Sequence, residues 1–193
     1  MDPTVESMRL GQFEFRMMNN PVRRLWQRSV EFPIFLRLLR QRHIELSGKS
    51  VMDAGCGSGY STKLIIDEFH PSRIVAFDLM PEQIRLAQKR GLDVCFRVGD
   101  ATRIESADAS VDAVFVFGVL HHIPEWKQAL AEISRVLKPG GVLLLEEPHF
   151  THFTYSFDWP ELETGMKEAG FAILECGPWL MGYFRSYLCQ RMA

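Results

Sequence analysis

The residues best suited to chemistry are the glycines of the segment Val51–Tyr60, VMDAGCGSGY. A short apolar stretch ends there in Asp53, and Gly55, Gly57 and Gly59 follow at every second position. Because glycine has no Cβ, such a turn lets backbone N–H groups face a ligand, and a helix predicted to follow it adds its N-terminus. The segment therefore predicts a ligand site between a strand and a helix.

The spacing of these glycines differs from that of a dinucleotide-binding turn. The pattern G-x-G-x-x-G would place its third glycine at position 60, where the chain has Tyr60, and the third glycine stands instead at Gly59. This spacing favours S-adenosylmethionine (SAM) over NAD or FAD as the ligand. One glycine turn is weak evidence, so the surrounding elements must supply the context.

After Lys49 the chain alternates between predicted strands and helices. The predicted strands are Ser50–Ala54, Arg73–Asp78, Val94–Gly99, Val111–Phe117 and Val142–Glu147, and the helices between them are Ser61–Phe69, Pro81–Arg90 and Glu125–Leu137. Near-continuous apolar strands alternating with helices predict a parallel, doubly wound sheet with right-handed crossovers. Ligands of such sheets bind beyond the carboxyl ends of the strands, near the switch in strand order.

The C-terminal part departs from this alternation. A helix is predicted over Pro160–Ala169, followed by strands over Ala172–Cys176 and Tyr183–Gln190, with Gly177, Pro178 and Gly182 between them. We expect an antiparallel hairpin that closes one edge of the sheet. The predicted fold class is thus α/β, a Rossmann-like doubly wound sheet of seven strands, with residues 46–193 as one compact domain.

Residues 1–45 are expected to form a helical cover that is rich in arginine and large apolar side chains. Pro21 and Pro33 are expected to break it into two or three short helices. Three interpretations stay open: a helix packed on the domain, a lid over the site, and contact with an anionic membrane surface, for which basic amphipathic helices are suited.

Composition narrows the class of protein further. The 193 residues carry a net charge of −2, which gives no general attraction to nucleic acid. Four scattered cysteines, Cys56, Cys95, Cys176 and Cys189, predict reduced thiols and no metal site. Neither a signal-peptide pattern nor an apolar run of about 20 residues occurs, so we expect a cytoplasmic protein.

At this point a family resemblance can be stated. Over residues 48–190 the chain resembles the class I SAM-dependent methyltransferases, in particular the small-molecule group that includes the quinone-biosynthesis C-methyltransferases. Four motifs occur in the family's order: VMDAGCGSG at 51–59, the acid Asp78 ending the second strand, Gly99-Asp100-Ala101 after the third, and Leu137-Lys138-Pro139-Gly140-Gly141 before the fifth. Each is weak alone, and their order and separation carry the assignment.

The resemblance implies SAM as cofactor and a set of residues that bind it. The turn residues Gly55, Cys56, Gly57 and Gly59 would lie along its methionine half, with Asp53 attracting the ammonium. The remaining implied contacts are Asp78 to the ribose hydroxyls, Leu79 and Met80 to the adenine face, Asp100 and Ala101 to the adenine edge, and Gly118 and Val119 near the sulfonium. Two simpler roles stay open: Asp100 as a cap for the Thr102 region and Met80 as a core residue.

Methyl transfer is an in-line displacement that needs alignment more than acid or base chemistry. A base is needed only where the acceptor loses a proton, and His121 and His122 are the candidates because imidazole titrates near neutral pH. Glu146, Glu147 and His149, at the end of the fifth strand, are candidates for lining the acceptor pocket.

The absence of a motif typical of nucleic-acid methyltransferases narrows the choice of methyl acceptor. Amino methyltransferases of nucleic acids in this fold carry Asn/Asp-Pro-Pro-aromatic after the fourth strand, whereas this chain has Phe117-Gly118-Val119-Leu120. We therefore expect a small, partly apolar acceptor and no nucleic acid. Three alternatives remain: a non-catalytic protein that binds SAM or S-adenosylhomocysteine, a nicotinamide or flavin oxidoreductase, and a lipid-directed methyltransferase docking through residues 1–45. A homodimer in which a second subunit completes the pocket also stays open.

Overall fold

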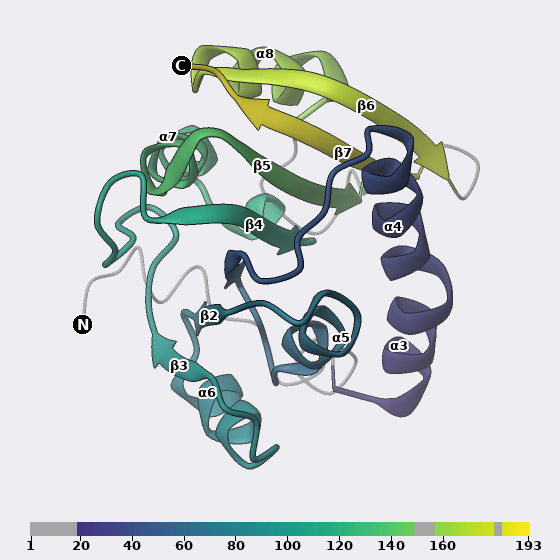
Figure 1. Cartoon of the computed structure of the whole chain (residues 1–193), viewed down its shortest axis with the longest axis vertical. Helices are drawn as coiled ribbons and strands as arrows, with labels where there is room; N and C mark the ends of the chain where they lie inside the picture. The colour runs from purple at the N-terminus through teal and green to yellow at the C-terminus, as the bar shows by residue number, and fades with distance from the viewer. Residues whose placement is uncertain (1–18, 149–156, 180–182) are drawn as a thin grey trace.

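The computed structural model describes residues 19–148, 157–179 and 183–193. Seven strands within these ranges form one sheet, in the order β3-β2-β1-β4-β5-β7-β6 (Figure 1). Their bounds are β1 Ser50–Ala54, β2 Arg73–Asp78, β3 Cys95–Val98, β4 Val111–Phe117, β5 Leu137–Pro148, β6 Phe171–Trp179 and β7 Phe184–Arg191. Strands β1 to β5 pair in parallel, and β7 is antiparallel to both its neighbours. The α/β sheet with a C-terminal hairpin, expected from the sequence, is confirmed.

Strand β4 illustrates why these segments become central strands. Its side chains alternate between the two faces, so that Val114 and Val116 join one apolar cluster while Phe115 and Phe117 join the other. All four are buried, because helices cover both faces of the sheet.

The helices form two layers (Figure 1). On one face, α7 (Trp126–Val136) and α8 (Trp159–Glu168) bury Leu130, Ile133 and Met166 against the sheet. The other face packs against α4 (Phe32–Gln41) and α5 (Tyr60–Phe69), whereas α6 (Pro81–Gln88) packs beside β2 and β3.

The N-terminal segment is one helical column in which α3 (Pro21–Trp26), a π-helical turn (Gln27–Glu31) and α4 follow without a break. Pro21 begins it, with the Asn20 side chain accepting a hydrogen bond from the Arg23 N–H at 2.8 Å. The expected break at Pro33 does not occur. The Phe32 N–H donates five residues back to Gln27, and such a π turn widens the helix just where the proline ring would crowd the preceding turn.

The hairpin is longer than expected. Gly177 and Pro178 lie inside β6 and not in the connecting turn, where Pro178 pairs with Arg185 of β7. Because β6 is the last strand of the sheet, one of its sides has no neighbouring strand, and edge strands are where a sheet tolerates proline.

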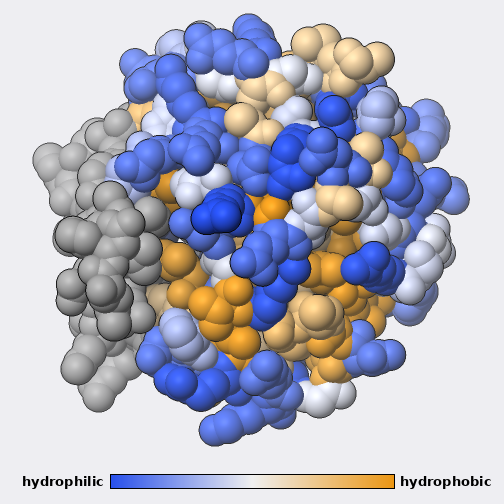
Figure 2. All heavy atoms as spheres, turned by 90° about the vertical axis from the view of Figure 1, so that its left-hand side faces the viewer, coloured by the Kyte–Doolittle hydropathy of each residue, from blue (hydrophilic) through white to orange (hydrophobic). Residues whose placement is uncertain are grey.

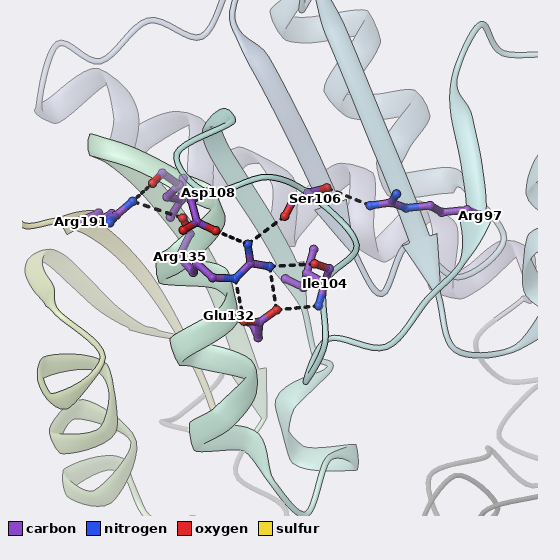
Figure 3. Close-up of polar contacts among 8 residues, drawn as sticks. Arg97, Ile104, Ser106, Asp108, Glu132, Arg135 and Arg191 are labelled. Atoms are coloured by element: carbon purple, nitrogen blue, oxygen red, sulfur yellow. Dashed lines mark hydrogen bonds and ion pairs between the residues drawn. The ribbon is translucent and has the colours of Figure 1, made fainter.

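Arg135, at the end of α7, holds the connection that leads from β3 to β4 (Figure 3). Its guanidinium donates hydrogen bonds to the Ile104 carbonyl at 2.8 Å, the Ser106 carbonyl at 2.9 Å, Asp108 at 2.6 Å and Glu132 at 2.8 Å. The Glu132 carboxylate in turn accepts the Ile104 N–H at 2.8 Å. This network fixes the chain just after residues 99–101, which the sequence assigns to the ligand site.

Hydrophilic side chains cover most of the face seen in Figure 2, and apolar side chains show between them. The most exposed large apolar residues of the described chain are Val22 and Leu25 on α3, Val98, Tyr183 and Met192. No helix among the described residues combines the length and apolar character needed to cross a bilayer.

The network predicts that Arg135→Gln lowers the free energy of unfolding by about 1–3 kcal/mol, because two carbonyls and two carboxylates lose a donor. Urea unfolding measures the change. The control is Arg103→Gln, an exposed arginine on the same connection, which should shift stability by less than about 0.5 kcal/mol. Equal losses in the two variants would contradict the role given to Arg135.

Candidate functional site

A cavity opens at the carboxyl ends of β1, β2 and β4, where the strand order switches, and beside the turn after β3. It encloses about 1030 Å³, including the part open to solvent. Of the residues expected to bind a cofactor, ten line it: Gly55, Cys56, Gly57, Asp78, Leu79, Met80, Asp100, Ala101, Gly118 and Val119. Asp53 and Gly59 lie behind the lining, and of the two histidines only His122 reaches it.

The three turn glycines all have positive φ, but a side chain would meet different surroundings at each of them. A Cβ on Gly55 would stand 2.4 Å from Val119, so the turn after β1 and the turn after β4 touch there. A Cβ on Gly59 would meet Ala87 and Phe96 at 3.0 and 3.1 Å. At Gly57 a Cβ would meet nothing within 4 Å, because that position faces the cavity. Gly57 therefore leaves room for a ligand to lie against the backbone.

Asp78, at the end of β2, joins the first turn to the second. One carboxylate oxygen accepts the Gly57 N–H and the other accepts the Met80 N–H, both at 2.9 Å. Burial raises the pKa of Asp78, and the two backbone donors lower it. Because a carboxylate oxygen has two acceptor sites, each can still take a hydrogen bond from a hydroxyl in the cavity.

Asp53 is fully buried at the end of β1 and faces α5. One of its oxygens accepts the hydroxyls of Ser61 and Thr62 at 2.7 and 2.6 Å, and the other has no hydrogen-bond partner. Burial raises the pKa of Asp53 to about 6, the two hydroxyls lower it and nearby Asp78 raises it further. A buried carboxylate with a free oxygen is suited to a cation, directly or through water.

The turn after β3 gives Asp100 a structural role as well as a place in the lining. Its Oδ1 accepts both the backbone N–H and the hydroxyl of Thr102 at 2.8 Å, which is the capping role left open by the sequence. Met80 combines both of its proposed roles too, since it is buried and still lines the cavity.

Glu147 organises the turn after β4 and does not line the cavity. Its fully buried carboxylate accepts the N–H groups of Val119, Leu120 and His121 at 2.9, 2.8 and 3.3 Å. The imidazole Nδ1 of His121 also lies 2.7 Å from it, which turns His121 away from the lining. The sequence-based expectation that Glu147 lines an acceptor pocket is therefore wrong for the described cavity, and His149 lies outside the described residues.

His122 packs against His121, with ring centroids 4.0 Å apart and ring planes tilted by 42°, and it faces the cavity. Burial and, to a smaller extent, His121 lower the pKa of His122 to about 3. The near-neutral titration expected from the sequence does not apply to this ring. A neutral imidazole with so low a pKa can orient a substrate by hydrogen bonding but is a weak proton acceptor.

A second acidic cluster lies beneath the cavity. Glu31 of the π turn pairs with Arg23 at 2.8 Å, and Glu146 of β5 lies nearby with one oxygen buried and without a partner. Burial raises the pKa of Glu146 well above its usual range, and Glu31 and Glu147 raise it further. Burial also raises the pKa of Glu31, whereas Arg23 lowers it. Burial therefore favours the protonated form more strongly at Glu146 than at Glu31.

Comparison with known proteins places the fold among known ones. Residues 52–145 match the family model described as a methyltransferase domain. Over these residues the chain resembles that domain. The matched part of the chain runs from β1 to β5.

Curated relatives and solved structures agree with this. The chain is 40% identical over 106 residues to a phthiotriol/phenolphthiotriol dimycocerosates methyltransferase of Mycobacterium ulcerans, covering 53% of this chain and 38% of that protein. It is 38% identical over 108 residues to a demethylmenaquinone methyltransferase of Renibacterium salmoninarum, covering 56% and 44%. Each match spans less than half of the relative's length. A SAM-dependent methyltransferase of Aquifex aeolicus shares the fold with a TM-score of 0.76 at 18% identity, covering 94% of this chain and 99% of that one.

Sequence reasoning missed the part of the cavity wall that comes from the N-terminal column. Asn19, Arg23, Arg24 and Gln27 all line it, as does Gln83 of α6. The many arginines of residues 1–45 were a signal that this segment could contact a ligand. Which arginine faces the cavity depends on how the helix packs against the sheet, and the charge pattern does not specify that.

The glycine geometry predicts that Gly57→Ala weakens SAM binding at least about tenfold, because the new Cβ occupies ligand space. Calorimetric titration measures the affinity. The matched control is Gly48→Ala, whose φ of +68 and open surroundings give the same backbone strain away from the cavity. Both variants should lose about 1–2 kcal/mol of stability, and equal SAM affinities would contradict the role of Gly57.

The raised pKa of Glu146 predicts a pH-dependent effect of Glu146→Gln. Unfolded glutamate ionises above a pH of about 4.3, while burial holds the proton on the folded carboxyl to a higher pH, so the stability of the wild type falls as pH rises from the unfolded pKa to the raised pKa of the folded state. Glutamine does not ionise, so the variant does not lose this stability. Its melting temperature should exceed that of the wild type at pH 8 but not at pH 4.5. Melting curves at the two pH values test this, and a difference that is independent of pH would contradict it.

Proposed function

We propose that this chain transfers the methyl group of SAM to a small, partly apolar acceptor. The observation that carries the proposal is the open position at Gly57 beside the Asp78 carboxylate, within a cavity that the family's motif residues line. The unpartnered oxygen of Asp53 supports the same ligand, since SAM carries an ammonium group and a positively charged sulfur. The residues therefore fit this cofactor.

Each group has a binding task. Asp78 would accept the ribose hydroxyls, Asp53 would stabilise the ammonium through a water molecule, and Ala101 would offer its backbone to the adenine ring. The Gly118–Val119 turn, held by Glu147, lies at the end of β4. SAM would supply a methyl group bonded to a positively charged sulfur, a good leaving group because the sulfur keeps the electron pair of the broken carbon–sulfur bond. The protein's contribution is alignment and exclusion of water.

The low pKa of His122 bears on which acceptors are suitable. An acceptor atom that must lose a proton gains little from a base this weak, so we favour an acceptor that is already nucleophilic or ionises in solution. His122 then orients the acceptor by a hydrogen bond. His121 contributes indirectly, by packing against His122.

Two relatives suggest the class of acceptor. They are named for phthiotriol dimycocerosates and for demethylmenaquinone, a lipid and a quinone. We infer an apolar ring or chain as the acceptor's main part. The exposed Val22 and Leu25, close in sequence to the exposed Arg28, support delivery from a lipid surface as a second possibility for the same reaction.

The test is SAM binding by wild type and by Asp78→Asn, measured by calorimetry. This substitution replaces the carboxylate proposed to accept two ribose hydroxyls with a neutral amide, so SAM binding should weaken about 10- to 100-fold. Asp67→Asn, an exposed acid on α5, is the control and should bind as the wild type does. A folded wild type that binds no SAM would overturn the proposal.

Turnover separates catalysis from simple binding. Methyl-labelled SAM is incubated with the protein and either a demethylated quinone or a lipid extract in vesicles, and labelled product is extracted. Label in either acceptor class supports the transferase. Tight SAM binding without transfer to any acceptor would favour a non-catalytic binding protein.

A further inference from the structure

Two guanidinium groups meet at the tyrosine that follows the glycine turn. Tyr60 is the first residue of α5. The Cζ of Arg24, from α3, lies 5.9 Å from its ring centroid, and the Cζ of Arg90, just beyond α6, lies 5.5 Å from it. Arg24 and Tyr60 both line the cavity. Three elements far apart in sequence thus bring two cations to one edge of the cofactor site.

The two arginines differ in what already holds them. Arg90 donates to the Ser58 carbonyl and, at 3.4 Å, to its hydroxyl. Arg24 has its Nε buried without a hydrogen-bond partner. None of the ion pairs found among the described residues involves either arginine. Burial and the charge of Arg24 lower the pKa of Arg90, which shows that the two cations repel each other.

The remaining arginine of the cavity wall is already engaged. Arg23 pairs with Glu31 at 2.8 Å, whereas Arg24, the next residue, turns to Tyr60. The start of the helix is fixed by the Asn20 cap and by a hydrogen bond of 3.2 Å from the Asn19 side chain to Gln83. Contacts of its neighbours thus place Arg24 at the cavity, and its guanidinium lies over the Tyr60 ring without forming an ion pair among the described residues.

We propose that Arg24 binds the carboxylate of the methionine part of SAM, and that the N-terminal helix is thereby a component of the cofactor site. The inference rests on the proposed function. With the ribose at Asp78 and the methionine chain along Gly57, the carboxylate lies toward the start of α5, where Arg24 and Tyr60 meet. A guanidinium and a carboxylate form strong charge-assisted hydrogen bonds, and the anion also relieves the repulsion between Arg24 and Arg90. Arg24 is a positioning residue for the methyl donor.

The test uses two cofactors that differ only in this group: SAM and decarboxylated SAM. Calorimetry on the full chain should give the wild type at least about tenfold higher affinity for SAM. Arg24→Gln should lose about 10- to 100-fold for SAM and less than about threefold for decarboxylated SAM. Arg24→Lys should keep part of the preference, and Arg28→Gln, an exposed arginine on the same column, should keep all of it.

The outcomes separate this inference from the proposed function. A folded wild type that binds neither cofactor would overturn the proposed function itself. Binding of both with equal affinity by the wild type would overturn only the role of Arg24, and this comparison needs no variant to fold. An equal loss for both cofactors in Arg24→Gln would also overturn it, because the arginine would then support the site and not the carboxylate.

Discussion

The site depends on close contact between two turns that follow neighbouring strands. The turn after β1 touches the turn after β4 at Gly55 and Val119, where any side chain on Gly55 would collide. Each turn is held by a carboxylate from the next strand over: Asp78 of β2 accepts the Gly57 N–H, and Glu147 of β5 accepts three N–H groups of the Val119–His121 turn. Backbone donors in a buried turn need such partners, so these acids shape the cavity before any ligand enters.

Buried acids surround this cavity on several sides. Asp53 and Asp78 have raised pKa values because of burial, and Glu31 and Glu146 lie below. Carboxylates placed in a core cost stability unless a partner compensates for lost water. In the proposed site, a cofactor with a sulfonium and an ammonium would supply such a partner, so affinity for a cationic ligand and reduced stability without it would have the same cause.

The N-terminal column links the sheet to the cavity. Its α4 half buries Phe32, Phe35, Leu38 and Leu39 in the core, while its α3 half contributes polar side chains to the cavity wall. The π turn lies between the two halves and carries Gln27 of the wall and Glu31 of the core. An extra residue within a turn changes which side chains face inward, a common reason for π turns at functional sites.

The sequence alone determined the order and type of the elements, because period, apolar runs and glycine spacing act locally: β1, β2 and β4 begin and end as expected. It also predicted ten of the residues that line the cavity, since the carboxyl ends of parallel strands must meet. Only the tertiary structure decided that Arg23 and Arg24 of the N-terminal column face the site, that Glu147 holds a turn, and that burial lowers the pKa of His122 to about 3. These outcomes depend on distances between residues far apart in the chain and on exclusion of water, and a linear pattern encodes neither.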